Sequence, residues 1–120
     1  MAVRCLIVDD NRGFLEVARA LLEREGLTIG GVASTSAEAL RAAEVLRPDV
    51  VLVDVSLREE SGFDLARRLV ADHDRRATVI LISTRSESDL ADLVALSPAA
   101  GFLSKSELSA AAIRAFLEGS

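Results

Sequence analysis

Residues 50–54 read Val-Val-Leu-Val-Asp and residues 6–10 read Leu-Ile-Val-Asp-Asp, so two short apolar runs each end in aspartate. Continuous aliphatic and β-branched runs are typical of strands buried on both faces, as in a parallel sheet covered by helices. Ligands of such sheets bind beyond the carboxyl ends of the strands. If the two strands are neighbours, Asp9, Asp10 and Asp54 converge at one edge of the sheet.

Three carboxylates this close together need a compensating positive charge. Like charges repel at short range, and a carboxylate removed from water costs free energy unless it is compensated. Divalent magnesium prefers oxygen ligands and commonly takes one or two carboxylates from a protein. The pattern therefore predicts a magnesium site in which Asp10 and Asp54 hold the metal and Asp9 lies nearby through water.

The whole chain alternates between strand-like and helix-like segments five times, which predicts an α/β fold with helices on both faces of a parallel sheet. The predicted strands are Val3–Asp9, Leu27–Val32, Val50–Asp54, Val79–Ile82 and Phe102-Leu103. The apolar faces of the predicted helices run from Phe14 to Leu22, Ala39 to Leu46, Phe63 to Val70, Leu90 to Val94 and Leu108 to Leu117. Gly26 is a predicted helix end, and Thr35 with Glu38 is a predicted capping box. Residues 1–120 contain no linker or repeat and are expected to form one domain.

Composition excludes several classes of protein. The chain has 120 residues, half of them hydrophobic, which is enough for one buried core. A net charge of −5 argues against nucleic acid as a direct partner, because phosphate binding requires a basic surface. No apolar stretch approaches the length of a bilayer span, so we expect no membrane insertion and a cytoplasmic location. The one cysteine, Cys5, is expected in the core, and the one histidine, His73, cannot form a histidine-rich zinc site.

Two further polar groups follow predicted strands and should reach the same sheet edge: Ser83 with Thr84, and Lys105. Lys105 is the only lysine in a chain that has 13 arginines. Its ammonium is a compact point charge that can approach a phosphoryl oxygen or a carboxylate closely. Together with the acids, these groups predict a phosphoryl-transfer site in which one aspartate is the nucleophile, since aspartate can form an acyl phosphate. The metal and Lys105 would offset charge on the transferring group, and a hydroxyl would hydrogen-bond one of its oxygens.

Four motifs, in order and over essentially the whole chain, resemble the receiver domain of two-component response regulators. They are Val8-Asp9-Asp10, Val53-Asp54 with Gly62 eight residues on, Ile82-Ser83-Thr84, and Gly101-Phe102-Leu103-Ser104-Lys105. The resemblance implies a flavodoxin-like, doubly wound sheet of five parallel strands in the order 2-1-3-4-5, with five helices.

The resemblance also implies a function and its residues. Asp54 would accept a phosphoryl group from a histidine kinase or a phosphotransfer protein in a reaction that depends on Mg²⁺. Asp9 and Asp10 would be the acid pair, and the Ser56 backbone carbonyl would complete the metal contacts. Lys105 matches the lysine of the family. The protein would be no enzyme beyond its own phosphorylation and dephosphorylation.

A conformational switch is part of what the family implies. The Ser83 hydroxyl would move toward the phosphoryl oxygen, and Phe102 would turn inward into the space that it leaves. This is a shift between two packings, which phosphorylation drives only as far as it favours one of them. The fourth helix, fifth strand and fifth helix would then present a changed surface to a downstream protein. The Ala-rich last helix leaves a monomer or a weak homodimer open.

The chain departs from the family pattern at several positions. Arg58 replaces the usual proline four residues after Asp54, and the following Glu59 and Glu60 either disturb the metal or face solvent. Pro98 should change the end of the fourth helix, because proline cannot take the positive φ of the usual glycine. Ser106 follows Lys105 in place of the common proline, so no cis peptide is expected there. Ser56 and Arg85 occupy positions that tune phosphoryl lifetime in the family.

Two other functional classes compete with a phosphate-accepting receiver. The first is a receiver-like interaction module that works without phosphorylation, which Arg58 and Pro98 leave open. The second is a free-standing enzyme such as a flavin carrier or an aspartate-based phosphatase. The Asp9-Asp10-Asn11 segment would repel a flavin phosphate without a metal, and no segment is long enough for a phosphatase cap. The chain could also be a receiver cut from a longer regulator.

Overall fold

The computed structural model describes residues 3–71, 77–86 and 88–118, and its centre is a sheet of five parallel strands. The strands are β1 (Arg4–Val8), β2 (Thr28–Ala33), β3 (Val50–Asp54), β6 (Thr78–Ser83) and β7 (Gly101–Ser104). Their order in the sheet is β2-β1-β3-β6-β7, which confirms the predicted order 2-1-3-4-5. The order reverses at β1, so β1 and β3 are neighbours and their carboxyl ends meet at one edge.

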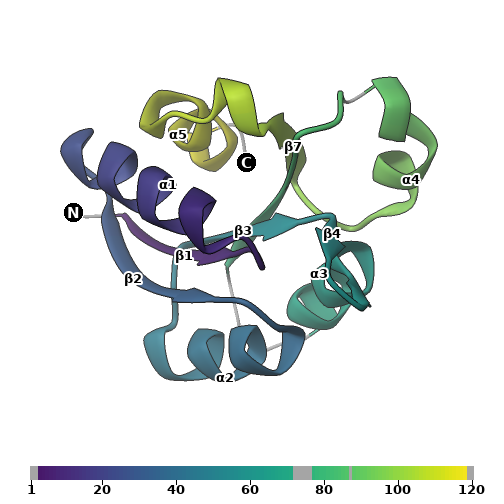
Figure 1. Cartoon of the computed structure of the whole chain (residues 1–120), viewed down its shortest axis with the longest axis horizontal. Coiled ribbons are helices and arrows are strands. Elements are labelled where there is room, and N and C mark those ends of the chain that lie inside the picture. Colours follow the sequence, from purple (N-terminus) through teal and green to yellow (C-terminus); the bar gives the residue numbers. More distant parts are fainter. Residues whose placement is uncertain (1–2, 72–76, 87, 119–120) are drawn as a thin grey trace.

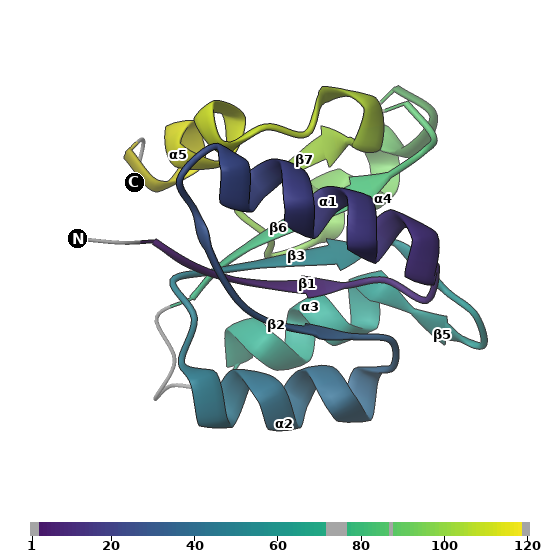
Figure 2. The same ribbon diagram turned by 60° about the vertical axis from the view of Figure 1, so that its left-hand side comes forward.

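Helices cover both faces of this sheet, as Figures 1 and 2 show. The described residues form α1 (Arg12–Arg24), α2 (Ser36–Leu46), α3 (Gly62–Ala71), α4 (Ala91–Leu96) and α5 (Ala110–Glu118), which confirms the predicted five helices. In Figure 2, α1 and α5 lie above the sheet and α2 and α3 lie below it. Among the described residues no helix has the length and apolar character required to cross a membrane.

The core consists of two layers, one on each side of the sheet. Cys5 and Ile7 of β1 pack with α1 and α5, whereas Leu6 and Val8 pack with α2 and α3. This alternation follows from the two-residue period of a strand. All five residues of β3 are buried, as expected for a central parallel strand. The continuous apolar runs in the sequence therefore correspond to strands with a helix layer on each face.

Helix ends depend on a few local contacts. The Thr35 hydroxyl accepts the Glu38 N–H at 3.1 Å, which confirms half of the predicted capping box. The Glu38 carboxylate accepts the N–H and the hydroxyl of Ser34, not the Thr35 N–H that the box requires. These bonds lower the pKa of Glu38. Gly26 follows α1 with a φ of 99°, a conformation in which glycine carries no steric penalty.

Some predicted boundaries differ in the structure. The polar stretch after β3 forms a small antiparallel hairpin of β4 (Ser56–Leu57) and β5 (Glu60–Ser61). The last helix begins at Ala110 and not at Leu108, because Leu108 is extended, with φ −65° and ψ 125°, after the 3-10 helix η2 (Lys105–Glu107). The described residues contain no cis peptide bond, in agreement with the expectation at Ser106. His73 lies outside the described residues.

The fourth helix includes Leu93 and Val94 of its predicted apolar face, whereas Leu90 precedes it. A 3-10 turn, η1 (Ser88–Leu90), precedes α4, which has only six residues. Ser97 at its end is extended, with φ −86° and ψ 144°. A residue before proline is disfavoured in the helical region, so Pro98 accounts for this ending. The helix therefore ends without the left-handed residue that a glycine would provide, as expected from the sequence.

Candidate functional site

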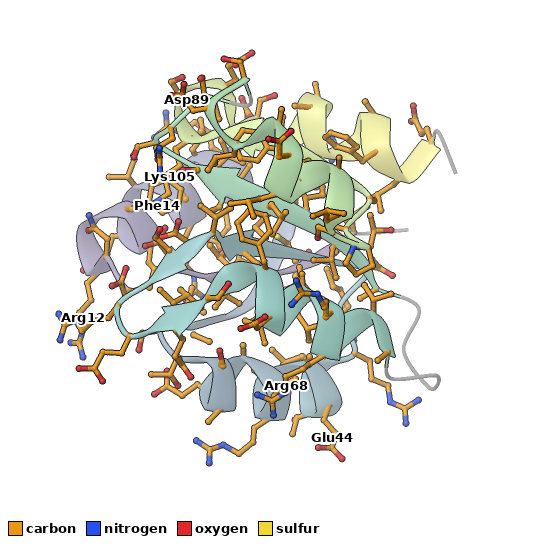
Figure 3. All side chains as sticks on the ribbon, turned by 90° about the vertical axis from the view of Figure 1, so that its right-hand side faces the viewer. Arg12, Phe14, Glu44, Arg68, Asp89 and Lys105 are labelled. Atoms are coloured by element: carbon orange, nitrogen blue, oxygen red, sulfur yellow. The ribbon has the colours of Figure 1, made fainter. Side chains whose placement is uncertain are left out.

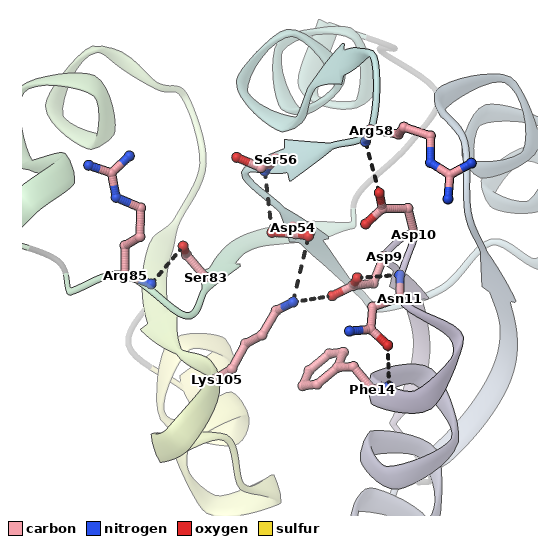
Figure 4. A network of polar contacts seen from close by, with 10 residues as sticks. All are labelled: Asp9, Asp10, Asn11, Phe14, Asp54, Ser56, Arg58, Ser83, Arg85 and Lys105. Carbon is pink, nitrogen blue, oxygen red and sulfur yellow. Dashed lines mark hydrogen bonds and ion pairs between the residues drawn. The ribbon is translucent and has the colours of Figure 1, made fainter.

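The strand register places four functional side chains at one edge of the sheet. Val8 of β1 pairs with Val53 of β3, so Asp9 and Asp54 follow as neighbours. Asp54 pairs with Ile82 of β6. Ser83 pairs with Ser104 of β7, and Lys105 comes next. The carboxyl ends of these strands thus bring together residues from four segments that are distant in sequence (Figure 4).

Three carboxylates form the centre of the site. One ligand oxygen from each of Asp9, Asp10 and Asp54 lies within 4.8 Å of the others. Asp9 and Asp54 are buried, whereas Asp10 is half-buried. The predicted convergence of the three acids is confirmed.

Lys105 lies between two of the acids. Its Nζ is 2.5 Å from Asp9 Oδ2 and 3.6 Å from Asp54 Oδ2, and its side chain is only 13% exposed. Asp9 Oδ1 accepts the Asn11 N–H at 2.8 Å. Within the described part of the chain, Asp9 Oδ2 has no aligned hydrogen-bond donor, so the ion pair with Lys105 is a charge contact. Asp9 is therefore held by one cation and one backbone amide.

The environment of Asp54 disfavours its ionised form. Burial and the nearby Asp9 carboxylate raise the pKa of Asp54 to about 6, and Asp10 adds to the effect. The Lys105 ammonium and the Ser56 N–H, which Asp54 Oδ1 accepts at 3.3 Å, offset part of it. One ammonium thus leaves the negative charge of the three acids only partly compensated.

These residues fit a hard divalent cation. Oxygen donors within 4.8 Å of one another, a raised pKa and a buried carboxylate oxygen without an aligned donor all favour an added positive charge. Asp10 and Asp54 are placed to supply ligand oxygens. Ser56 lies two residues after Asp54 at the start of β4, and its carbonyl stays a predicted ligand.

The predicted hydroxyl residues and the predicted aromatic residue differ in how far they are buried. Ser83 is buried, and its hydroxyl accepts the Arg85 N–H at 3.0 Å. Thr84 is exposed, and among the described residues no hydrogen bond joins it to the acidic cluster. Phe102 is 8% exposed and already packs in the core layer that contains Leu81 and Leu90. The site therefore has one hydroxyl in a buried position, that of Ser83, and an aromatic ring that is already turned inward.

Gly62 has a steric role that the motif alone did not explain. A Cβ at this position would lie 1.9 Å from the Asp54 carbonyl oxygen and 2.8 Å from the Val55 Cα. The Gly62 N–H also donates to the Val55 carbonyl at 3.0 Å. Glycine is needed because the start of α3 packs directly on the backbone of Asp54.

The β4–β5 hairpin is attached on two sides. The Arg58 N–H donates to Asp10 Oδ2 at 3.0 Å. Glu60 Oε1 accepts the Ser36 N–H at the first turn of α2, at 2.9 Å. Glu59 is exposed, as one of the two interpretations held. Glu60 is exposed as well, and its carboxylate in addition binds the N-terminus of α2.

Two residues near the acids were not identified from the sequence. The Asn11 side chain accepts the Phe14 N–H at 3.1 Å and caps α1. The Phe14 ring faces Lys105, whose Nζ is 4.3 Å from the ring centroid. Asn11 carries a recognisable cap signal, since asparagine is favoured before a helix. Phe14 carries none, because its spacing marks it only as part of the apolar face of α1.

An acidic cluster with one lysine, at the carboxyl edge of a sheet ordered 2-1-3-4-5, defines the class of protein to which the chain should be compared. The model of the response regulator receiver domain matches residues 5–117. The chain belongs to the receiver domain family of two-component response regulators.

Individual relatives agree with this assignment. The chain is 31% identical over 104 residues to the response regulator GacA of Pseudomonas viridiflava, a match covering 86% of this chain and 48% of GacA. It is similar to the structure of a two-component response regulator of the LuxR family from Aurantimonas sp. SI85-9A1, with 27% identity, a TM-score of 0.85 and coverage of 99% and 87%. A CheY-like receiver domain from Methylobacillus flagellatus, 24% identical with a TM-score of 0.81 and coverage of 99% and 98%, shares the fold. The chain spans about half the length of GacA.

Proposed function

We propose that Asp54 accepts a phosphoryl group from a histidine kinase or a phosphotransfer protein, in a reaction that depends on Mg²⁺. The observation that carries this proposal is the position of Asp54, beside a lysine ammonium at 3.6 Å and within 4.8 Å of two further carboxylates. A structural ion pair would not need three acids for one lysine. Three acids beside one lysine instead suit a site that binds a metal ion and a phosphoryl group.

The transfer is a displacement at phosphorus. An oxygen of the Asp54 carboxylate forms a bond to phosphorus, and the bond between phosphorus and the donor nitrogen breaks. The donor imidazole leaves with the electron pair of that bond, and Asp54 becomes an acyl phosphate. With a pKa of about 6, the Asp54 carboxylate is mostly ionised at neutral pH and available as the nucleophile. Hydrolysis by water later breaks the new bond, releases phosphate and restores the carboxylate, and we propose no catalysis by this chain beyond these two reactions on itself.

The other residues of the site have positioning and charge roles. Asp10, Asp54 and the Ser56 carbonyl would hold the metal, and Asp9, in the same acidic group, pairs with Lys105 and would orient it. When bound, Mg²⁺ supplies positive charge that offsets the oxygens of the transferring group. Lys105 would supply a second positive charge beside Asp54, and the exposed Thr84 follows Ser83 as a second candidate hydroxyl.

Ser83 and Phe102 would couple phosphorylation to packing. The Ser83 hydroxyl exchanges the Arg85 N–H for a phosphoryl oxygen, to which it donates a hydrogen bond. Phe102 is already buried, so phosphorylation stabilises a packing that the unmodified chain can adopt. The surface formed by α4, β7 and α5 then presents the change to a downstream protein. We place this exchange in the cytoplasm, with no direct contact to nucleic acid by this domain, and with the chain as a monomer or a weak homodimer.

The proposal is tested with two aspartates of the same strand region. Wild type, Asp54→Asn and Asp49→Asn are incubated with acetyl phosphate and Mg²⁺, and intact masses are recorded. Asp49 lies just before β3, at the opposite end from Asp54, and its carboxylate accepts the Arg4 N–H. We expect one added phosphoryl group in wild type and Asp49→Asn, and none in Asp54→Asn. Undiminished labelling of Asp54→Asn would contradict the assignment. Absence of labelling in all three folded proteins would favour an interaction module that works without phosphorylation.

A further inference from the structure

Phe14 is a side chain that contacts Lys105 and to which the proposed chemistry gives no role. It is the third residue of α1 and is half-buried. Its N–H is fixed by the Asn11 side chain, and its ring lies 4.3 Å from Lys105 Nζ. Figures 3 and 4 show the ring and the ammonium side by side.

The contacts around Phe14 form a closed circuit. Lys105 Nζ pairs with Asp9 Oδ2, and Asp9 Oδ1 accepts the Asn11 N–H. Asn11 Oδ1 accepts the Phe14 N–H, and the Phe14 ring returns to Lys105. Each member of the circuit is thereby held by two others, and the α1 cap is connected directly to the position of the ammonium.

The aromatic face has a physical consequence for Lys105. A lysine ammonium sits on a flexible four-carbon stem and can rotate among several acceptors. Asp9 and Asp54 attract it from one side. The negative face of an aromatic ring attracts a cation within about 6 Å of its centroid, so Phe14 adds an attraction from another side. An aliphatic side chain of similar size would fill the same space without attracting the charge.

We propose that Phe14 is a positioning residue that holds the Lys105 ammonium beside Asp54 for phosphoryl transfer. In this role it acts through Lys105 and takes no direct part in the reaction at Asp54. The inference rests on the proposed function, because the role of Lys105 belongs to that reaction. The competing explanation is packing alone, since Phe14 also packs against the core layer of α1 and α5.

Variants that keep volume but change the ring separate these explanations. In Phe14→Leu the apolar contact is kept and the aromatic face is lost, whereas Phe14→Tyr keeps both. A cation–π attraction at a partly exposed site corresponds to a rate effect of about two- to fivefold. We therefore expect Phe14→Leu to be phosphorylated by acetyl phosphate about two- to fivefold more slowly at saturating Mg²⁺, with unchanged Mg²⁺ affinity, and Phe14→Tyr to match wild type.

Fluorinated phenylalanines at residue 14 give a finer series. Added fluorine atoms withdraw charge from the ring face and change the volume little. The rate of phosphorylation should fall step by step as the number of fluorine atoms rises. Equal rates across the series, or a Leu variant as fast as wild type, would overturn the inference in favour of packing.

The single lysine of the chain allows a direct structural readout. Isotope-labelled lysine gives signals from Lys105 alone, and protons that lie over an aromatic ring are shifted upfield. We expect upfield Lys105 Hε signals in wild type and Phe14→Tyr, and a return to ordinary values in Phe14→Leu. Identical Lys105 signals in all three proteins would show that the Phe14 ring does not lie over Lys105.

The two readouts also separate the inference from the proposed function. Upfield signals in a wild type that is never phosphorylated would overturn the proposed function, and with it the positioning role of the contact in that reaction. Phosphorylation of the wild type at a rate that no Phe14 variant alters would overturn the positioning role alone.

Discussion

Asp54 is a residue whose ionised form is destabilised by the folded structure. Its carboxylate is buried beside Asp9, and these two causes raise its pKa above the ordinary value of 3.8, to about 6. The folded protein thus binds the Asp54 proton more tightly than the unfolded chain does. The resulting penalty is absent below pH 4, develops as pH rises to about 6, and is complete above that value.

The raised pKa of Asp54 predicts how the free energy of unfolding depends on pH in the absence of metal. In EDTA, wild type and Asp54→Asn should have similar free energies of unfolding near pH 4, by the linkage rule. Near pH 7 the wild type should be less stable than Asp54→Asn by about 2 kcal/mol, with solvent screening at the open side of the site included. Urea unfolding across this pH range measures the difference, with exposed Glu59→Gln as the charge control. A difference that is independent of pH would contradict the electrostatic account of Asp54.

Asp10 differs from its two neighbours because it is half-buried and has no contact with Lys105 among the described ion pairs. Its replacement by alanine should therefore act mainly on metal binding. We expect Asp10→Ala to weaken Mg²⁺ binding about tenfold or more, because a carboxylate ligand is lost. Binding is read from the Mg²⁺-dependent rise in melting temperature, which follows ligand affinity for the folded state. Asp64→Ala, an exposed substitution with the same charge change, is the control, and an Asp10→Ala affinity equal to that of this control would exclude Asp10 as a ligand.

At the scale of elements, the β4–β5 hairpin connects the site to α2. Of its two attachments, Arg58 N–H to Asp10 comes from the turn and Ser36 N–H to Glu60 is made at the start of β5. A carboxylate at a helix N-terminus satisfies a free backbone N–H and interacts favourably with the helix dipole. The unusual acids after Arg58 are thus partly explained by a stabilising contact with α2.

Removal of the Glu60 contact should destabilise the fold in a graded way. We expect Glu60→Ala to lower the free energy of unfolding by about 1 kcal/mol, the usual size of a helix-capping interaction. Glu60→Gln keeps an acceptor oxygen and should lower the free energy of unfolding by less. Chemical denaturation gives these values, and hydrogen exchange at the Ser36 amide reports the bond itself. Glu59→Ala is the matched control, and a Glu60→Ala protein as stable as this control would mean that the contact contributes nothing.

At the scale of the whole molecule, the sheet could be predicted because each buried strand corresponds to a short continuous stretch of sequence. Fully apolar runs such as residues 50–53 identify buried parallel strands, and the register of those strands then brings the acids together. The same strand pattern predicts Ser83 and Lys105 at the sheet edge, where the pairing of β6 with β7 places them.

Other features could not be predicted because they depend on contacts between distant segments. The Glu60–Ser36 bond joins residues 24 apart, and the Phe14–Lys105 contact joins the first turn of α1 to the end of β7. Their residue types have common alternative roles, solvation for glutamate and core packing for phenylalanine. The hairpin and the late start of α5 at Ala110 were missed for a different reason, since short turns carry weak periodicity.

We propose that the acidic cluster makes this chain a magnesium-dependent phosphoacceptor. The most direct test is the intact mass of the wild-type protein after incubation with acetyl phosphate, in paired samples that contain either Mg²⁺ or EDTA. We predict a gain of one phosphoryl group with Mg²⁺ and none with EDTA. No gain in protein shown to be folded, or an equal gain in both samples, would contradict it.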